Sequence, residues 1–347
     1  MLELVLPTTF NCLADLGRLP WFTSYDDRVV VSDESIGPII DIHTHLALAY
    51  VRPMQLDLYK DARHTEHYLP SCCKLDLDVY VNRNFEPKDL AAMKRDLTLG
   101  SLRSSGMRKT HTVPNLLREM NELGIEHSVI LPIDFPALSE NWIHATSAAK
   151  STEKLIAFGS VHPYARNVRD KLDTQVSRGI RGIKVHPAVQ LVRPDDARAM
   201  TLYRLCGERN LPVLWHCGPV GIEPALGRWL SQVRFYEQPI AENPKTTFIL
   251  GHAGALQWEE ALDLVRRYPN VLVETSSQSL HALRRMVESV DSTRILLGSD
   301  WPFYHQAISL AKVLIATEGR ADTRHRILYA NAAELLGLER RKKSRVA

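Results

Sequence analysis

The sequence predicts an α/β protein built on a (β/α)8 TIM barrel. Eight short apolar runs, rich in β-branched residues, alternate with helix-like segments, and their spacing is regular from residue 112 onward. Near-continuous apolar runs of this kind are typical of parallel strands that are buried on both faces. Eight such units, with no other β pattern, indicate that the sheet closes into a barrel.

The predicted strands share an apolar body and a polar end. They span residues 37–45, 125–133, 155–163, 179–187, 211–218, 246–254, 270–277 and 294–300. Helical patterns fill the intervals, for example at 167–179, 195–210 and 256–270, and a last pattern at 323–338 predicts a closing helix. The barrel is therefore expected to span residues 37–340.

One interval breaks the regular spacing. Residues 46–111 separate the first strand from the segment at 112–124, which predicts the first barrel helix. An irregular segment of this length inside a compact domain usually serves a function, and it leaves the end of strand one where the barrel opens. We expect a lid-like insert there, an N-terminal extension at 1–36 packed outside the barrel, and a solvated basic tail at 341–347.

Composition excludes several classes of protein. Hydrophobic residues make up 45% of the chain and charged residues 24%, as in a soluble globular protein, and a net charge of +3 is too small to predict a nucleic-acid partner. The five cysteines are scattered without a CxxC pair, which favours a reducing compartment. No basic leader and no membrane-length apolar run is visible. We expect a cytoplasmic protein that acts on a small molecule without nucleic-acid or membrane partners; base rates alone suggest a homodimer.

Polar side chains lie at the C-terminal ends of five of the eight predicted strands. Residues two apart in a strand face the same side, so His43 and His45 form one pair, and Lys184 and His186 form another. The other three strand ends carry His216, His252 and Asp300, each just before a turn. A single histidine here is more often structural, but burying so many titratable groups together costs several kcal/mol unless a cation satisfies them. Zinc, manganese and iron prefer these ligands.

Five motifs in this order carry a family resemblance: "DIHTHL", "GIKVHP", "LWHCG", "ILGHAG" and "LLGSDWP". The chain resembles the amidohydrolase superfamily and, within it, the amidohydrolase-related branch of metal-dependent hydrolases and decarboxylases. The resemblance covers residues 37 to about 340 and is weakest over the insert.

The resemblance implies roles for these residues. His43, His45 and His216 would bind the metal, and Asp300 would contact both the metal and its water. His252 would be a second-metal ligand or a catalytic acid or base. Lys184 would be a carboxylated bridge between two ions or would hold an anionic group of the substrate, and His186 would bind metal or substrate. One or two ions, most readily zinc, with manganese or iron as alternatives, are therefore expected.

Other residues are weaker candidates. His162, Arg52, Glu274 and Trp301 are predicted to contact the substrate, and Ser277 is an alternative to Glu274 at the end of strand seven. His64 and His67 have the i,i+3 spacing that would place both on one face of a helix. Each of these residues also has an ordinary structural interpretation.

The predicted chemistry is hydrolysis of an amide, ester or lactone bond of a small organic substrate, using a water that the metal activates and from which Asp300 takes a proton. The alternative is a decarboxylase for a small aromatic or unsaturated acid, with Lys184 or Arg52 holding the carboxylate. A nuclease, an iron oxygenase on the same scaffold and a non-catalytic metal-binding protein are less favoured.

Overall fold

The computed structural model describes residues 6–26, 28–50, 54–100, 105–136 and 138–338. Within these residues, eight strands follow the predicted order along the chain. They are β4 (Ile39–Thr44), β6 (Ile125–Ile130), β7 (Leu155–Ala157), β8 (Ile183–Val185), β9 (Val213–His216), β10 (Phe248–Gly251), β11 (Val271–Glu274) and β12 (Ile295–Leu296). Each lies inside one of the predicted runs.

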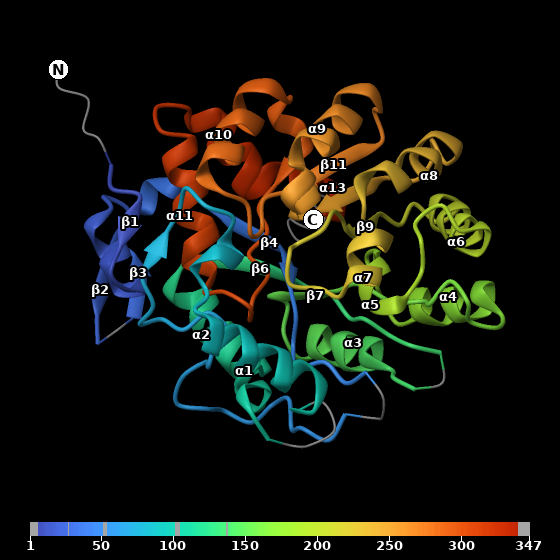
Figure 1. The fold of residues 1–347 in the computed structure, drawn as a ribbon, viewed down its shortest axis with the longest axis horizontal. Coiled ribbons are helices and arrows are strands. Elements are labelled where there is room, and N and C mark those ends of the chain that lie inside the picture. The colour runs from blue at the N-terminus through green and yellow to red at the C-terminus, as the bar shows by residue number, and fades with distance from the viewer. Residues whose placement is uncertain (1–5, 27, 51–53, 101–104, 137, 339–347) are drawn as a thin grey trace, which may run out of the picture.

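These strands are parallel and close into a barrel. Hydrogen bonds join them in two groups, β4-β6-β7 and β8-β9-β10-β11-β12. The groups meet at both edges, through a bridge between Gly159 and Ile183 and another between Thr44 and Trp301. At the second edge the amide of Asp300 also donates to the carbonyl of His43 over 2.8 Å. The predicted (β/α)8 architecture is confirmed (Figure 1).

The barrel interior is a small apolar cluster closed at one end by a helix. Alternate residues of the strands meet there, among them Ile40, Ile42, Val129, Ile156, Leu214, Ile249 and Leu296. Ala332, Ala333 and Leu336 of α13 (Asn331–Leu336) pack beneath them. Helix α13 therefore covers one end of the barrel. The polar side chains lie at the opposite end, where the strands terminate.

Helices surround the strands as parallel pairing requires. The main barrel helices are α2 (Val113–Glu122), α3 (Asn141–Ser151), α4 (Val168–Ser177), α6 (Ala197–Gly207), α9 (Trp258–Arg267), α10 (Leu280–Ser289) and α11 (Gln306–Ala316). Shorter helices lie between them: α5 (Pro187–Gln190), α7 (Ala225–Leu230), α8 (Glu237–Glu242) and α12 (Ala321–His325). The prediction of a first barrel helix at 112–124 is confirmed by α2.

The N-terminal residues pack outside the barrel, beside α11 (Figure 1). They form β1 (Thr9–Phe10), the helical turn η1 (Leu13–Arg18), a hairpin of β2 (Phe22–Tyr25) and β3 (Arg28–Val31), and the turn η2 (Glu34–Ile36). β1 pairs antiparallel with β5 (Leu75–Asp76) of the insert. The extension therefore supports the insert as well as the barrel wall.

The insert at 46–111 has its own short elements. After β5 come η3 (Val81–Asn84), α1 (Pro87–Thr98) and η5 (Met107–Thr110). Two backbone hydrogen bonds pin it to the β11–α10 loop: Val81 N–H donates to the Ser277 carbonyl over 2.9 Å, and Leu280 N–H donates to the Leu77 carbonyl over 2.7 Å. The insert is thus fixed to the barrel rim at this point.

None of the helices in the described part of the chain is both long enough and apolar enough to span a bilayer.

Candidate metal centre

A register break at the end of β4 turns His43 into the barrel. Ile40 and Ile42 point into the interior, so regular alternation would turn His43 outward. The pairing of β4 with β6 shifts between Asp41 and Thr44, and the His43 ring faces inward, with Nε2 3.3 Å from Lys184 Nζ. The irregularity therefore brings both histidines of the "HTH" motif to the barrel mouth.

Three acceptor atoms converge at that mouth. His43 Nε2 lies 3.2 Å from His45 Nε2, and Asp300 Oδ1 lies 3.5 Å and 3.4 Å from these two nitrogens. His43 Nδ1 donates to Glu274 Oε1 over 2.8 Å, and His45 Nδ1 donates to the Leu131 carbonyl over 2.7 Å. Each ring therefore presents an unprotonated Nε2, and two facing lone pairs repel unless a cation lies between them.

The spacing of these atoms fits a metal ion. Ligands at about 2.1 Å around a tetrahedral ion lie about 3.4 Å from one another. His43, His45 and Asp300 match that separation, and all three are nearly buried, Asp300 being the most exposed at 8%. Burial and neighbouring positive charges hold the pKa of His43 well below its ordinary value. This histidine is therefore neutral at neutral pH, as a metal ligand must be.

Glu274 lies behind His43 rather than in the open part of the site. Its Oε1 accepts from His43 Nδ1, from the His252 amide and from Ser276 Oγ, and its Oε2 accepts from the Ser276 amide. The side chain is fully buried. Both oxygens already accept hydrogen bonds from the protein, which favours an orienting role for Glu274 over the predicted contact with substrate. A carboxylate in this position orients the histidine and makes Nε2 a better ligand.

The remaining strand-end histidines form a second group beside the first. His252 Nε2 lies 3.0 Å from His216 Nδ1, and the ring of His186 stacks on that of His216 with centroids 3.9 Å apart. The His43 and His252 rings are also close, with centroids 4.8 Å apart. Burial lowers the pKa of His216 to about 3 and those of His186 and His252 well below the ordinary value. The predicted ligands therefore cluster, and His216 and His252 stay predicted ligands of a first or second ion.

A second combination of donors involves Glu274. His43, His252 and Glu274 also bring one ligand atom each within 4.8 Å of one another. We favour the His43, His45 and Asp300 group because the oxygens of Glu274 accept four hydrogen bonds from the protein, whereas the Nε2 atoms of the "HTH" pair are approached by one donor, Lys184 Nζ, 3.3 Å from His43 Nε2.

His252 sits on a strained loop. It has φ of 54°, and Ala253 and Ala255 follow with φ of 43° and 51°, a region that residues with a Cβ rarely adopt. The side-chain amide of Gln278 bridges the loop, since Nε2 donates to the carbonyls of His252 and Ala255 over 2.6 Å and 2.9 Å. Ser276 Oγ lies 2.7 Å from His252 Nδ1. The β11–α10 loop thus fixes both the backbone and the ring of His252.

Lys184 is buried next to the converging acceptors. Its Nζ lies 3.3 Å from His43 Nε2, and among the described residues no carboxylate lies within 4.0 Å of it. Burial lowers the pKa of Lys184 to about 8, against the opposing charges of Asp300 and Glu274. An amine of this kind is available for carboxylation or for a substrate anion, so both predicted roles stay open.

The other predicted substrate contacts lie in different places. His162 lines a cavity of about 880 Å³ beside Phe135 and Trp142. Trp301 is fully buried and donates through Nε1 to Glu119 Oε2 over 3.1 Å, on the outer side of the barrel wall, which corrects its prediction as a pocket residue. Arg52 and the basic tail lie outside the described residues.

The histidines of the insert do not form a helical pair. Residues 64–67 contain no helix, His64 is exposed, and His67 Nε2 pairs with Glu119 at 2.9 Å. The helical spacing predicted from "RHTEH" was wrong, because local packing against α2 decides the conformation. His67 instead joins the insert to the barrel wall.

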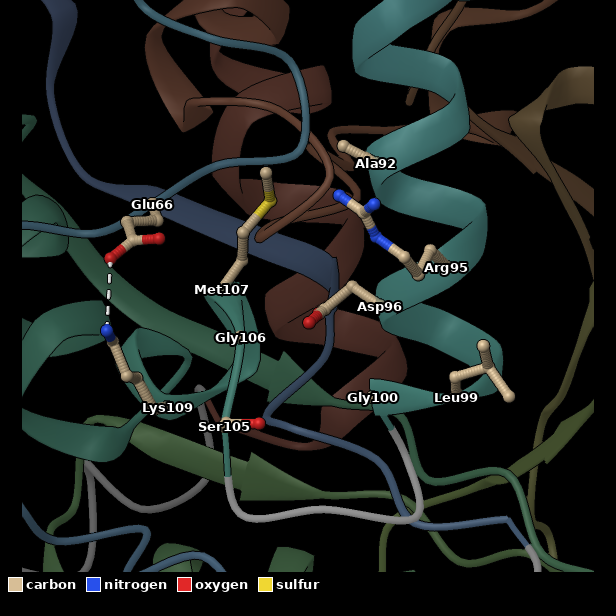
Figure 2. Close-up of a pocket in the computed structure, with 10 residues that line it drawn as sticks. All are labelled: Glu66, Ala92, Arg95, Asp96, Leu99, Gly100, Ser105, Gly106, Met107 and Lys109. Carbon is tan, nitrogen blue, oxygen red and sulfur yellow. Dashed lines mark ion pairs between the residues drawn. The ribbon is translucent and has the colours of Figure 1, made fainter.

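A further cavity lies within the insert and holds none of the predicted ligands. It has a volume of about 350 Å³ and lies between α1 and residues 105–109 (Figure 2). Arg95 and Asp96 come from α1, and Lys109 on the other side pairs with Glu66 at 3.7 Å. This cavity belongs to the insert rather than to the candidate metal centre.

Sequence reasoning missed Glu274 as an orienting residue, and also Ser276, Gln278 and Tyr80. The polar run "TSSQS" after strand seven could have indicated a hydrogen-bonding loop at the site. Tyr80 lies in the insert, where nothing in the sequence indicates that it reaches the barrel mouth.

A closed parallel barrel with histidines and an aspartate gathered at the ends of its strands defines a TIM-barrel protein with a candidate centre for divalent metal. The chain belongs to the amidohydrolase family, whose sequence model matches residues 40–338. No curated protein shows significant similarity to the sequence.

Solved structures share the fold at low sequence identity. An uncharacterised TIM-barrel protein from Bordetella bronchiseptica superposes with a TM-score of 0.60 at 19% identity, covering 87% of this chain and 99% of that one. A probable 2-pyrone-4,6-dicarboxylic acid hydrolase from Acinetobacter baumannii has a TM-score of 0.53 at 15% identity, covering 86% and 99%. A 5-carboxyvanillate decarboxylase from Novosphingobium aromaticivorans, solved with manganese, has a TM-score of 0.57 at 14% identity, covering 86% and 99%.

Proposed function

We propose that this protein is a metal-dependent hydrolase that cleaves an amide, ester or lactone bond of a small organic substrate. The observation that carries the proposal is the convergence of His43 Nε2, His45 Nε2 and Asp300 Oδ1 within 3.5 Å of one another, without a proton between the two nitrogens. A divalent ion bound by these atoms would polarise a carbonyl group and lower the pKa of a water molecule.

The protein residues around this site would move protons and hold the metal ligands in place. Asp300, whose pKa is raised by burial, is the base that takes a proton from the attacking water and returns it to the leaving group. His252 belongs to the neighbouring group of histidines, with Ser276 Oγ 2.7 Å from its Nδ1 and His216 Nδ1 3.0 Å from its Nε2, and we assign it the role of orienting or protonating the departing atom. Glu274 fixes His43, and the Leu131 carbonyl fixes His45.

The donor set supports zinc as the preferred metal. Two imidazole nitrogens and one carboxylate, with a neighbouring third imidazole, suit zinc, and manganese or iron is an alternative. A structural relative was solved with manganese. For the compartment, all five cysteines are free thiols, which supports a reducing cytoplasmic environment. The homodimer stays a prediction.

A decarboxylase is the second candidate. The observation that favours it is Lys184, a buried amine beside the site with no carboxylate within 4.0 Å among the described residues. Such a group would hold the carboxylate of an aromatic or unsaturated acid while Asp300 or His252 protonates the ring carbon. Structural relatives include enzymes named as hydrolases and as decarboxylases.

One paired assay separates these functions. Metal-loaded protein is incubated with dihydrocoumarin, an aromatic lactone, and separately with 2,6-dihydroxybenzoate, the acid that one structural relative was solved with. A hydrolase releases acid from the lactone, and Asp300→Asn loses this activity while retaining most of the metal. Release of carbon dioxide from the acid without cleavage of the lactone would show that the protein is a decarboxylase. An Asp300→Asn protein that still cleaves the lactone contradicts the role of Asp300 as the base.

A further inference from the structure

The insert places one tyrosine at the barrel mouth and holds it firmly. Tyr80 lies between Leu77 and Val81, the two insert residues whose backbones bond to the β11–α10 loop at Leu280 and Ser277. A third backbone bond, from the Arg83 amide to the Tyr80 carbonyl, closes the turn that follows. Hydrogen bonds on both sides therefore fix the position of Tyr80 relative to the barrel.

The hydroxyl of Tyr80 is buried without a hydrogen-bond partner. The residue is 6% exposed, and its Oη makes no hydrogen bond of normal geometry. Burial is the largest cause that raises the pKa of Tyr80, Tyr304 and Asp300 raise it further, and the nearby Ser277 hydroxyl lowers it. A buried hydroxyl that loses its hydrogen bonds to water and gains none in the protein lowers the stability of the fold by about 1–3 kcal/mol. Such groups are therefore rare in native proteins, and each one calls for an explanation.

The neighbouring tyrosine shows the ordinary arrangement. Tyr304 Oη donates to Asn82 Oδ1, and Asn82 Nδ2 in turn donates to the Val220 carbonyl over 3.0 Å. Tyr304 is therefore satisfied within the protein. Tyr80, from the same region and similarly buried, makes no hydrogen bond of normal geometry, although the Ser277 hydroxyl lies near it.

We propose that Tyr80 is a substrate-binding residue whose hydroxyl donates a hydrogen bond to a carbonyl or carboxylate oxygen held beside Asp300. The proposal deepens the proposed function and rests on it, because it places that oxygen over the candidate metal centre. It applies to either reaction, since an acyl oxygen is present in a lactone and in a carboxylic acid. The insert would then contribute to substrate recognition, not only to covering the site.

The first test measures stability without a ligand. Tyr80→Phe removes only the hydroxyl, and because that group has no partner, the melting temperature of the metal-loaded protein should stay the same or rise. Tyr304→Phe is the matched comparison, since it strips Asn82 of its donor, and its melting temperature should fall by about 2–4 °C. A fall in Tyr80→Phe as large as that in Tyr304→Phe overturns the proposal, because it would show that the hydroxyl has a structural partner.

The second test measures binding of benzoate, a small planar carboxylate, to metal-loaded protein by calorimetry. Loss of one hydrogen bond should weaken benzoate binding to Tyr80→Phe at least about fivefold. Tyr268→Phe is the control, because Tyr268 lies between α9 and the start of β11, at the end of the barrel opposite the strand termini, and its hydroxyl donates to Glu237 over 2.9 Å; its affinity should match the wild type. Equal benzoate affinity of the wild type and Tyr80→Phe, or no benzoate binding by the wild type, overturns the proposal.

Metal content separates this proposal from the proposed function. A wild-type protein that fails to retain divalent metal removes the proposed function. Full metal content in both proteins, with unchanged benzoate affinity in Tyr80→Phe, removes only the role of Tyr80.

Discussion

Glu274 Oε1 accepts a hydrogen bond from His43 Nδ1 over 2.8 Å, and the side chains of both residues are at most 1% exposed. This contact fixes which nitrogen of His43 carries the proton, and so leaves Nε2 to face His45 and Asp300. Glu274, at the end of β11, thereby determines which nitrogen His43 of β4 offers to a metal. Strand β12 lies between β11 and β4.

The first prediction concerns this pair. Glu274→Gln keeps the size of the side chain but turns an amide N–H toward donors that now bond the carboxylate, so His43 loses its fixed tautomer. We expect metal affinity to fall about 10- to 100-fold while the fold survives, as measured by competition with a metal chelator. Glu237→Gln is the control, because Glu237 pairs with Arg267 and accepts from Tyr268 away from the donor set; it should leave metal affinity unchanged. Unchanged affinity in Glu274→Gln would show that Glu274 does not orient a ligand.

The second prediction concerns the loop that carries His252. Gln278→Leu leaves the carbonyls of His252 and Ala255 without their donor in a loop whose φ angles are already strained. We expect the free energy of unfolding in urea to fall by about 2 kcal/mol or more. Gln238→Leu removes a surface hydrogen bond to Glu242 and should change the free energy by less than about 0.5 kcal/mol. Equal effects of the two substitutions would mean that Gln278 is not what holds the loop.

The third prediction concerns pH and a buried lysine away from the metal centre. Lys312 Nζ donates to the Gln278 carbonyl over 2.5 Å, and burial lowers the pKa of Lys312 from 10.5 to about 7. Between these two values the unfolded chain binds more protons than the folded one, so this group makes stability rise with pH. Relative to Lys312→Met, the wild type should gain about 2 kcal/mol between pH 7 and pH 9.

Urea unfolding of the wild type and Lys312→Met at both pH values provides the check, since other groups that titrate in this range affect the two proteins alike. A difference between them that stays constant with pH would place the pKa of Lys312 near its ordinary value.

The parts of the fold that depend on local pattern could be predicted from the sequence. The eight strands and the helix at 113–122 lie where apolar periodicity and turn residues placed them, and the polar strand ends meet because parallel strands share one carboxyl edge. The inward turn of His43 depends on a register break in β4, which alternation alone does not indicate. Periodicity identified the site but not the geometry of its first strand.

The rest depends on contacts between distant segments. Tyr80 is held at the barrel rim only because the insert bonds to the β11–α10 loop, and Trp301 turns away from the site because its Nε1–H donates to Glu119 of α2. Neither contact leaves a pattern in the sequence around these residues. A carboxylate at a strand end, such as Glu274, likewise gives the same signal whether it contacts substrate or a neighbouring histidine.

The central claim is that His43, His45 and Asp300 bind a divalent ion, and metal analysis of His45→Ala tests it most directly. Wild type, His45→Ala and the control His64→Ala, which changes an exposed histidine of the insert, are saturated with zinc, freed of excess ion and analysed by mass spectrometry. We predict one or two ions per chain in the wild type and the control, and severe loss of metal in a His45→Ala protein whose circular dichroism is unchanged. Full metal content in His45→Ala, or none in the saturated wild type, would contradict the assignment.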